Sequence, residues 1–259
     1  PHDITVVSNA VRPPMGIEGK EHITVSQKLY YNPNPNLSVL VYGSSFFMNT
    51  YDLIQDMTFS QARDWTAGTK VTYHVKDWFS VTGSLHADFY DRFKRHERID
   101  KRQKDYESSI YQPRLTVTSN YFNGHSLILG MEHTSDELTS DRFSGNANHD
   151  LKTRALKETE YFLQDEWTIN PRWMISAGIR TNFSKAFGFM GMPKVAAKYS
   201  PDKHWSLRAN YSMGYRSPSI KELFFNWDHL GMFMIRGNEN MRPEKNNYFS
   251  LGAEYSNDR

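Results

Sequence analysis

The stretch from Trp205 to Phe225, WSLRANYSMGYRSPSIKELFF, alternates between two kinds of side chain and then stops at a proline. In its first half every second residue is apolar or aromatic, and the residues between are polar or very small, including Arg208 and Arg216. A period of two predicts a β-strand with one apolar and one polar face. Pro218 has no amide hydrogen for a strand ladder, so we expect the strand to end just before it.

The same alternation recurs along most of the 259 residues, and helical periodicity is nearly absent. Two further clear examples are WMISAGIRTNF (173–183) and YFSLGAEYS (248–256). We therefore expect an all-β chain. Its strands are expected near 21–31, 37–51, 65–75, 79–93, 108–122, 125–138, 156–169, 173–184, 193–200, 205–216 and 247–257.

The segments between these strands alternate in length. The short ones are rich in Asn, Pro, Gly or Asp, as tight turns are, and lie at 32–36, 76–78, 123–124, 170–172 and 200–204. The long ones are expected at about 52–64, 94–107, 139–155, 185–192 and 217–246. Tight turns at one end of a sheet and long loops at the other are typical of transmembrane β-barrels. Aromatic residues beside the short turns fit an interfacial girdle: Trp78, Phe79, Trp167, Trp173 and Trp205.

Composition excludes several other classes of protein. The chain has no run of 18 apolar residues, so it encodes no transmembrane helix. It has no cysteine, which excludes thiolate metal sites and disulfides. Its net charge is only +2, so we expect no nucleic-acid partner. A soluble β-rich binding or adhesin-like protein and a passive porin remain the alternatives.

Two proline-bearing sequences, here called the first and second box, resemble those of a known family. The first box is YRSPSIKEL (215–223), and the second is GNENMRPEK (237–245), which leads into the strand FSLGAEY. In order and spacing they resemble the boxes Y/F-R-A-P-S-x-K-E-L and G-N-P-N-L-K-P-E of TonB-dependent outer-membrane receptors, which transport haem, siderophores or cobalamin. Departures are mild, such as Ser217 for alanine and Glu239 for proline. The resemblance is specific from about Tyr161 to Tyr255 and rests on pattern alone before that.

The resemblance implies an antiparallel transmembrane β-barrel segment of about eleven strands from a barrel of about 22, in the outer membrane of a Gram-negative bacterium. An odd number of strands also indicates part of a larger barrel. Residues 1–259 are thus expected to be part of the barrel domain, without its plug domain or C-terminal strands. The implied partners are the lipid bilayer and, through the plug region, the TonB complex; a surface lipoprotein is left open. Such receptors do no covalent chemistry, so no enzyme activity and no cofactor are expected.

The boxes supply most of the candidate functional residues. Arg216 and Arg208 lie on the polar face of their strand, where a guanidinium can hold a carboxylate of the plug. Glu222 and Glu244 are expected to cap or pair locally. The favoured interpretation is structural, with the boxes fixing where a strand ends and the next begins. The motif residues on which these roles depend are Tyr215, Arg216, Pro218, Arg208, Asn238, Asn240, Pro243 and Glu244.

The segment between the boxes contains His229 among aromatic and methionine residues. Haem receptors of the family carry an iron-ligand histidine between the same boxes, and imidazole suits haem iron. The resemblance therefore implies His229 as a metal ligand, with Phe225, Trp227 and Met232 against a porphyrin face. The cargo is expected to be an iron chelate such as haem or a siderophore, with haem the preferred form, although a siderophore or a corrinoid fits the aromatic loop nearly as well. A histidine that only helps to pack the loop is the alternative.

Two charged sequences are expected to have no chemical role. The run from Asp91 to Glu107 has seven Lys or Arg residues against five Asp or Glu, and we interpret it as a solvated strand extension and loop tip. Asp165 and Glu166 are neighbours in a strand and so should face opposite sides, which argues against acid–base catalysis.

Overall fold

The structure, a computed structural model, describes residues 18–52, 58–96, 101–143, 150–229 and 233–257. Most of these residues lie in β-strands, and eleven of the strands form one antiparallel sheet. No helix in these ranges is long and apolar enough to cross a membrane.

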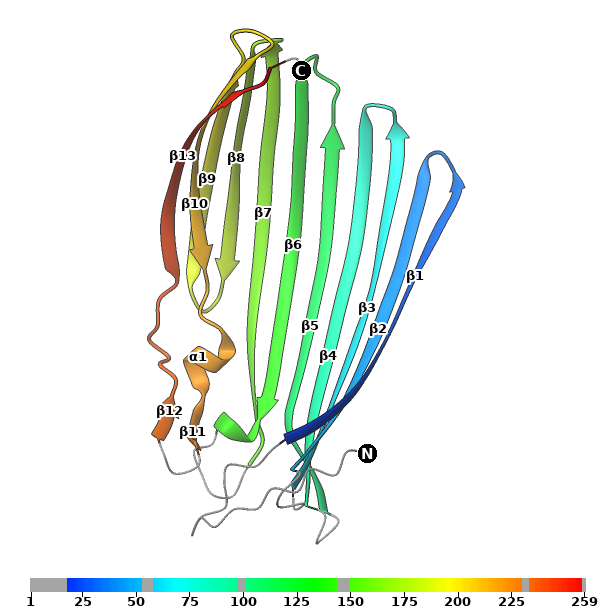
Figure 1. Cartoon of the computed structure of the whole chain (residues 1–259), viewed down its shortest axis with the longest axis vertical. Helices are drawn as coiled ribbons and strands as arrows, with labels where there is room; N and C mark the ends of the chain where they lie inside the picture. The colour runs from blue at the N-terminus through cyan, green and yellow to red at the C-terminus, as the bar shows by residue number, and fades with distance from the viewer. Residues whose placement is uncertain (1–17, 53–57, 97–100, 144–149, 230–232, 258–259) are drawn as a thin grey trace.

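The sheet follows chain order and curves into an open half-barrel (Figure 1). Its strands are β1 (Glu18–Asn34), β2 (Leu37–Asp52), β3 (Thr58–Lys76), β4 (Phe79–His96), β5 (Lys101–Ser119), β6 (His125–Ser140), β7 (Lys152–Asn170), β8 (Trp173–Ser184), β9 (Gly188–Tyr199), β10 (Trp205–Arg216) and β13 (Glu244–Tyr255). In the described part, β1 pairs only with β2 and β13 only with β10, so the sheet does not close. The predicted all-β fold of eleven antiparallel strands is confirmed.

The strands extend further toward the long loops than the sequence pattern predicted. β3 begins at Thr58 and stays in register with β4 to His96, so the expected loops at 52–64 and 94–107 are much shorter. The prediction of a long loop at 185–192 is wrong. A turn follows β8, and β9 begins at Gly188, whose φ of 75° suits glycine. Strand pairing continues here because the ladder needs only backbone groups, whereas the apolar alternation fades.

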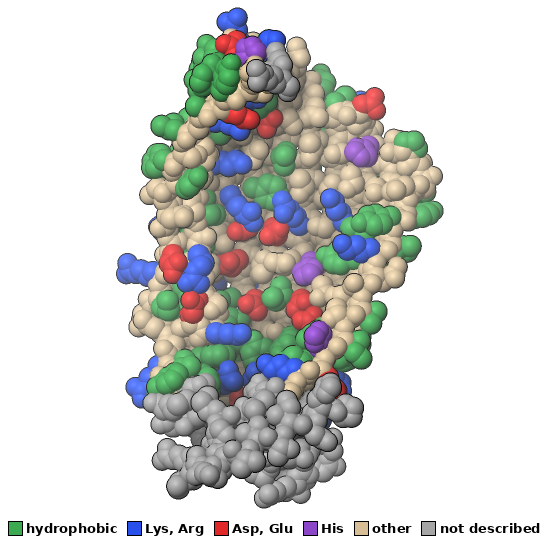
Figure 2. Space-filling view, viewed as in Figure 1, with side chains coloured by type: hydrophobic (Ala, Val, Ile, Leu, Met, Phe, Trp, Pro, Cys, Tyr) green, Lys and Arg blue, Asp and Glu red, His purple; other side chains and the backbone are tan. Residues whose placement is uncertain are grey.

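The two faces of the sheet differ in chemistry. Apolar side chains point outward and stay largely exposed, such as Leu115 (45%), Leu129 (52%), Leu163 (44%) and Ile179 (46%). Acidic and basic side chains gather over the middle strands on the face turned to the viewer in Figure 2, and hydrophobic ones protrude along its margins. Such an arrangement suits hydrocarbon outside and water inside.

Glycines on the inner face make room for aromatic side chains. Gly130 of β6 is paired with Phe162 of β7, and a Cβ on Gly130 would lie 2.3 Å from the Phe162 ring. In the same way Tyr42 of β2 lies over Gly68 of β3. These aromatic–glycine pairs fix the register of neighbouring strands.

The chain between β10 and β13 folds against the inner face of the sheet. It contains α1 (Ile220–Phe224) and a two-stranded hairpin of β11 (Asn226–His229) and β12 (Phe233–Arg236). Ile220 and Phe225 form a buried cluster with Leu138 of β6 and with Phe143 of η2 (Asp141–Phe143). Figure 1 shows α1 and the hairpin below the ends of β8–β10, beside the lower part of β7.

The two faces can be tested by placing one charge on either side of β5. Leu115→Arg puts a guanidinium on the outer face and should lower the free energy of unfolding from a bilayer by about 2–4 kcal/mol, because the charge then faces lipid. Thr116→Arg, on the inner face, should have a much smaller effect because the guanidinium stays in water. Urea titration of the full-length barrel in phospholipid vesicles measures both, and equal losses would contradict the assignment of the faces.

Candidate functional site

The two boxes lie side by side and are joined by the Arg216 guanidinium. Arg216 is the last residue of β10 and pairs in register with Glu244, the first residue of β13. Its nitrogens donate to both carboxylate oxygens of Glu244, at 2.8 and 3.2 Å. They also donate to both oxygens of Glu222, at 3.0 and 3.1 Å. One arginine therefore links a carboxylate from each box in the bidentate geometry that favours guanidinium over ammonium.

Glu222 also closes the start of α1. Ser219 is the N-cap: its hydroxyl oxygen accepts from the Glu222 amide at 3.3 Å, and the Glu222 carboxylate accepts from the Ser219 amide at 2.8 Å. This is a capping box, and its Ser-x-x-Glu spacing is visible in the first box. Glu222 thus fixes the helix and holds Arg216 at the same time.

The second box begins against the end of α1. The Asn238 amide donates to the Glu222 carbonyl at 2.9 Å, and the Gly237 amide donates to the Phe225 carbonyl. A Cβ on Gly237 would lie 2.6 Å from the backbone of Leu223, so only glycine allows this approach. Asn238 then turns the chain, because its side-chain oxygen accepts from the Asn240 amide at 2.9 Å.

The first box is anchored to the inner wall of the sheet. The Ser217 hydroxyl donates to the Glu158 carboxylate of β7, and the neighbouring Pro218 is buried. Tyr215 is half-buried beside them, and Pro243 lies just before β13. Arg208 lies toward the short-turn end of β10, where it pairs with Glu254 at 3.0 Å and is exposed. The structure therefore gathers the motif residues of both boxes and leaves Arg208 apart.

The aromatic residues predicted to contact cargo are used in packing the loop. Phe225 is only 8% exposed and packs on Phe143, with 5.4 Å between ring centroids. The Arg142 guanidinium lies 4.1 Å from the centroid of the Trp227 ring. Both rings thus tie the box segment to the loop after β6.

The predicted iron ligand is placed only by its backbone. His229 ends β11 and pairs in register with Phe233, but its side chain lies outside the described residues, as does the whole of Met232. Within the part of the chain that the structure describes, no three His, Asp or Glu side chains come together as metal ligands.

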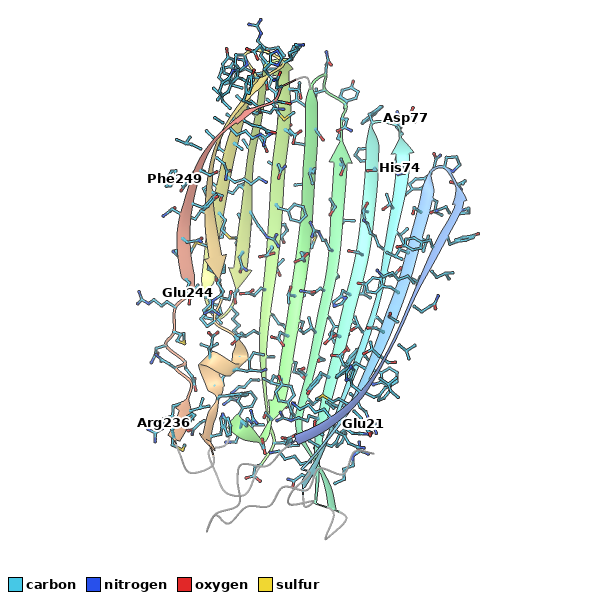
Figure 3. All side chains as sticks on the ribbon, in the orientation of Figure 1. Glu21, His74, Asp77, Arg236, Glu244 and Phe249 are labelled. Atoms are coloured by element: carbon cyan, nitrogen blue, oxygen red, sulfur yellow. The ribbon has the colours of Figure 1, made fainter. Side chains whose placement is uncertain are left out.

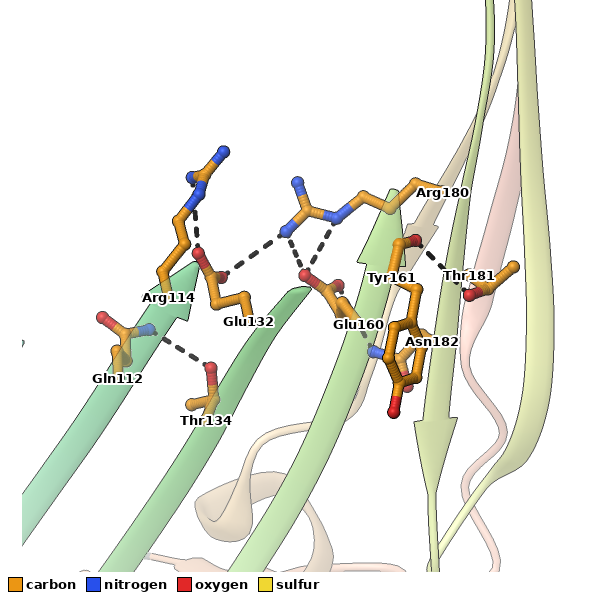
Figure 4. A network of polar contacts seen from close by, with 9 residues as sticks. All are labelled: Gln112, Arg114, Glu132, Thr134, Glu160, Tyr161, Arg180, Thr181 and Asn182. Atoms are coloured by element: carbon orange, nitrogen blue, oxygen red, sulfur yellow. Dashed lines mark hydrogen bonds and ion pairs between the residues drawn. The ribbon is translucent and has the colours of Figure 1, made fainter. Parts of the chain in front are cut away.

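A ladder of charges that the sequence did not reveal crosses the inner face of β5–β8 (Figure 4). The Glu132 carboxylate lies between Arg114 (3.4 Å) and Arg180 (3.5 Å). Arg180 also donates from Nε to Glu160 at 2.9 Å, and Glu160 accepts from the buried Asn182. These residues occupy the polar phase of four strands, but only the register brings them together.

The charged run from Asp91 to Glu107 is less solvated than predicted. A register shift between β4 and β5 leaves Asp105 as an extra residue, and its side chain is 3% exposed. Arg92 binds it through two nitrogens at 2.9 and 3.1 Å, and Lys94 lies 3.1 Å away. A β-bulge turns Asp105 inward, which the run of charges alone did not indicate. The predicted strand extension is confirmed, but full solvation of the run is wrong.

Figure 3 places the second box within the whole molecule. The labelled Arg236, at the end of β12, lies near the foot of the sheet, and Glu244 lies where β13 joins it. The box therefore carries the chain from the inner hairpin back into the wall.

Replacing Arg216 should loosen both boxes while the sheet stays folded. Arg216→Gln leaves Glu222 and Glu244 without their common partner and close to each other. We expect faster amide hydrogen exchange throughout 217–243 in the full-length protein. Arg208→Gln, a matched change on the same face of β10, should leave this exchange unchanged; equal effects would contradict a linking role for Arg216.

Acid should release the same contact. Hydrogen bonds from Arg216 and then from Ser219 lower the pKa of Glu222 from 4.5 to about 2. A carboxylate whose pKa is lower in the folded chain than in the unfolded chain stabilises the fold fully at a pH above its unfolded pKa. This stabilisation is lost as the pH falls from the unfolded pKa toward the folded pKa. Protection of the Asn238 amide, corrected for intrinsic exchange, should decline over this interval. Glu222→Gln should remove the decline, and persistence of the decline in that variant would assign it to another group.

The fold is shared with outer-membrane receptors of known structure. The siderophore receptor PirA from Acinetobacter baumannii aligns with a TM-score of 0.74 at 12% identity, over 94% of this chain and 42% of that one. A mutant of the ferric enterobactin receptor PfeA from Pseudomonas aeruginosa, in complex with enterobactin, aligns with a TM-score of 0.77 at 15% identity, over 96% and 43%. At these identities the likeness shows the fold alone.

Sequence comparison adds a curated relative and a family. The iron-regulated outer membrane virulence protein of Vibrio cholerae is 25% identical over 190 residues, which are 71% of this chain and 27% of that protein. The chain thus spans about a quarter of the length of this relative. The family described as TonB dependent receptor-like, beta-barrel matches residues 18–259. The chain therefore belongs to the TonB-dependent receptor β-barrel family.

Proposed function

We propose that the full-length protein imports an iron chelate across the outer membrane with energy from the TonB complex. The observation that carries this proposal is the family match over 18–259 on a half-barrel with an apolar outer face and a charged inner face. The members of this family are transport receptors, so the proposed activity is transport without covalent chemistry or a cofactor. The TonB complex would act through a plug region beyond the described residues.

A siderophore is the favoured form of the chelate. PirA is named a siderophore receptor, and PfeA a ferric enterobactin receptor. The Vibrio cholerae relative is named for its regulation by iron. These names support iron as the nutrient and a siderophore as its carrier.

Haem is the second candidate, and it depends on His229. This residue ends β11 in the hairpin between the two boxes, and Phe233 pairs with it in register. A neutral imidazole at this place is a suitable ligand for haem iron. Trp227 contacts Arg142 and Phe225 contacts Phe143, and these two contacts hold the hairpin against the loop after β6.

The full-length receptor should restore growth to an iron-starved strain that lacks its own receptors when the right chelate is supplied. Uptake of radioactive iron should stop when a protonophore removes the energy source. Binding at the cell surface should remain, because the protonophore does not alter the loops. Uptake that persists without energy would instead indicate a passive porin.

His229→Ala separates the two candidate cargoes. If the cargo is haem, the variant should bind haem more weakly, and wild-type affinity should itself fall as the pH drops through about 6.5, where imidazole becomes protonated. Siderophore uptake and barrel assembly should not change. Unchanged haem spectra and unchanged growth on haem would remove His229 from the site.

A further inference from the structure

The charges on the inner face are sorted by strand. β6 and β7 carry five inward-facing acids, at Glu132, Asp136, Glu158, Glu160 and Glu166. β8, β9 and β10 contain no Asp or Glu at all, and their inward positions carry Arg180, Lys194, Lys198, Arg208 and Arg216. A basic stripe therefore runs along one side of the concave face, next to an acidic one.

Two cations of this stripe differ from the others. Arg180, Arg208 and Arg216 are each held by one or two glutamates. Lys194 and Lys198 of β9 make no ion pair with any residue that the structure describes. They face the same side of one strand, four residues or about 13 Å apart.

The surroundings of these two lysines leave their charges available to a ligand. Lys194 lies between Gly178 and Ser212 in the register, and neither neighbour has a side chain large enough to cover it. Lys198 lies directly opposite Arg208. Like charges opposite each other destabilise a strand pair, and of these two residues only Arg208 has a carboxylate partner among the described residues, Glu254.

A cavity adjoins each lysine. One of about 320 Å³ lies in the middle of the wall and is lined by Arg114, Phe162, Gln164, Arg180, Met192 and Lys194. Another of about 630 Å³ lies at the short-turn end, and its charged lining residues are the cations Arg172, Lys198, Lys203 and Arg208 and the acids Asp202 and Glu254. The first has no acidic lining residue, and the Arg114 guanidinium lies 4.8 Å from the centre of the Phe162 ring. Its size suits one aromatic ring or carboxylate arm of a chelate.

We propose that the basic stripe of β8–β10 is the path by which an anionic iron chelate passes along the barrel wall, with Lys194 and Lys198 as successive contacts. This inference rests on the proposed function. The ligand class is a polyanionic ferric chelate with catecholate or carboxylate arms. Cations that line one side of a low-dielectric channel raise the local concentration of anions. Because neither lysine forms an ion pair within the described ranges, a passing anion need not break such a pair there to bind it.

Charge reversal of the two lysines in the full-length receptor tests the path. Lys194→Glu combined with Lys198→Glu should reduce energised uptake of a polyanionic ferric chelate by about tenfold, at the lower end of electrostatic effects on encounter rates. Uptake of a neutral ferric trihydroxamate should change by less than about twofold, because its transfer gains nothing from the field. Surface binding without energy should be unchanged for both chelates.

Lys70→Glu is the matched control. Lys70 faces the same lumen from β3, between Leu40 and Ser84, and it too has no ion pair in the described ranges. The charge change is the same, but the residue lies on the opposite wall, so anionic uptake should stay near wild type. The corresponding Lys→Gln variants, which should give smaller losses in the same order, keep the test valid if charge reversal lowers the amount of folded barrel.

Three results would overturn the proposed path. They are an equal loss with Lys70→Glu, an equal loss for the neutral chelate, and unchanged uptake of the anionic chelate. In each case a wild-type receptor that still imports iron leaves the proposed function standing. A full-length wild type that imports no iron chelate would instead overturn the proposed function itself.

Discussion

The hydrogen-bond ladder between strands is the constraint on which the rest of this structure depends. A wall in contact with lipid must pair its backbone groups internally, because hydrocarbon offers no partners. The ladder is nearly continuous from β1 to β10, but β9 and β10 pair only as far as Lys194 and Ser212. The residue of β9 that precedes Lys194 is Pro193, which has no amide hydrogen to extend the pairing. Beyond this point β10 keeps only β13 as a partner and leads into the first box.

The segment between the boxes compensates for a low part of the wall. β7 has 19 residues, whereas β8, β9, β10 and β13 have 12 each. At about 3.3 Å per residue, the strands on this side are about 23 Å shorter than β7. α1 and the β11–β12 hairpin lie beside the long part of β7 at this level (Figure 1). Burial of Ile220 and Leu223 holds them there, at about 1.5–3 kcal/mol for each side chain. The exposed Arg216 contacts add less energy, and their role is to align the two boxes.

The sequence predicted what depends on local pattern and missed what depends on register. Alternation located all eleven strands, and the boxes located the place where the chain leaves and rejoins the sheet. The ladder of Arg114, Glu132, Arg180 and Glu160 was missed because its members are 18 or more positions apart in sequence and meet only through pairing. Asp105 was missed because a single bulge reverses the side to which a residue points. The sequence could not show what Phe225 packs against, because an aromatic loop residue looks the same in sequence whether it packs a ligand or the loop itself; in the structure its ring packs on Phe143.

Two kinds of cation lie on the inner wall. Some are held by carboxylates and serve the structure, and others have no such partner among the described residues and can bind a ligand. Arg216 is bound by two carboxylates whose positions are fixed by a helix cap and a strand start, so any ligand would have to displace both. Arg180 is held in the same way by Glu160 and Glu132. Arginine suits such positions because its planar fork satisfies two oxygens at once, while lysine carries a mobile point charge. The wall uses arginine where strands and boxes must be held together, and β9 keeps lysines between small or like-charged neighbours. A surface built in this way can attract an anion without binding it so tightly that it cannot move on.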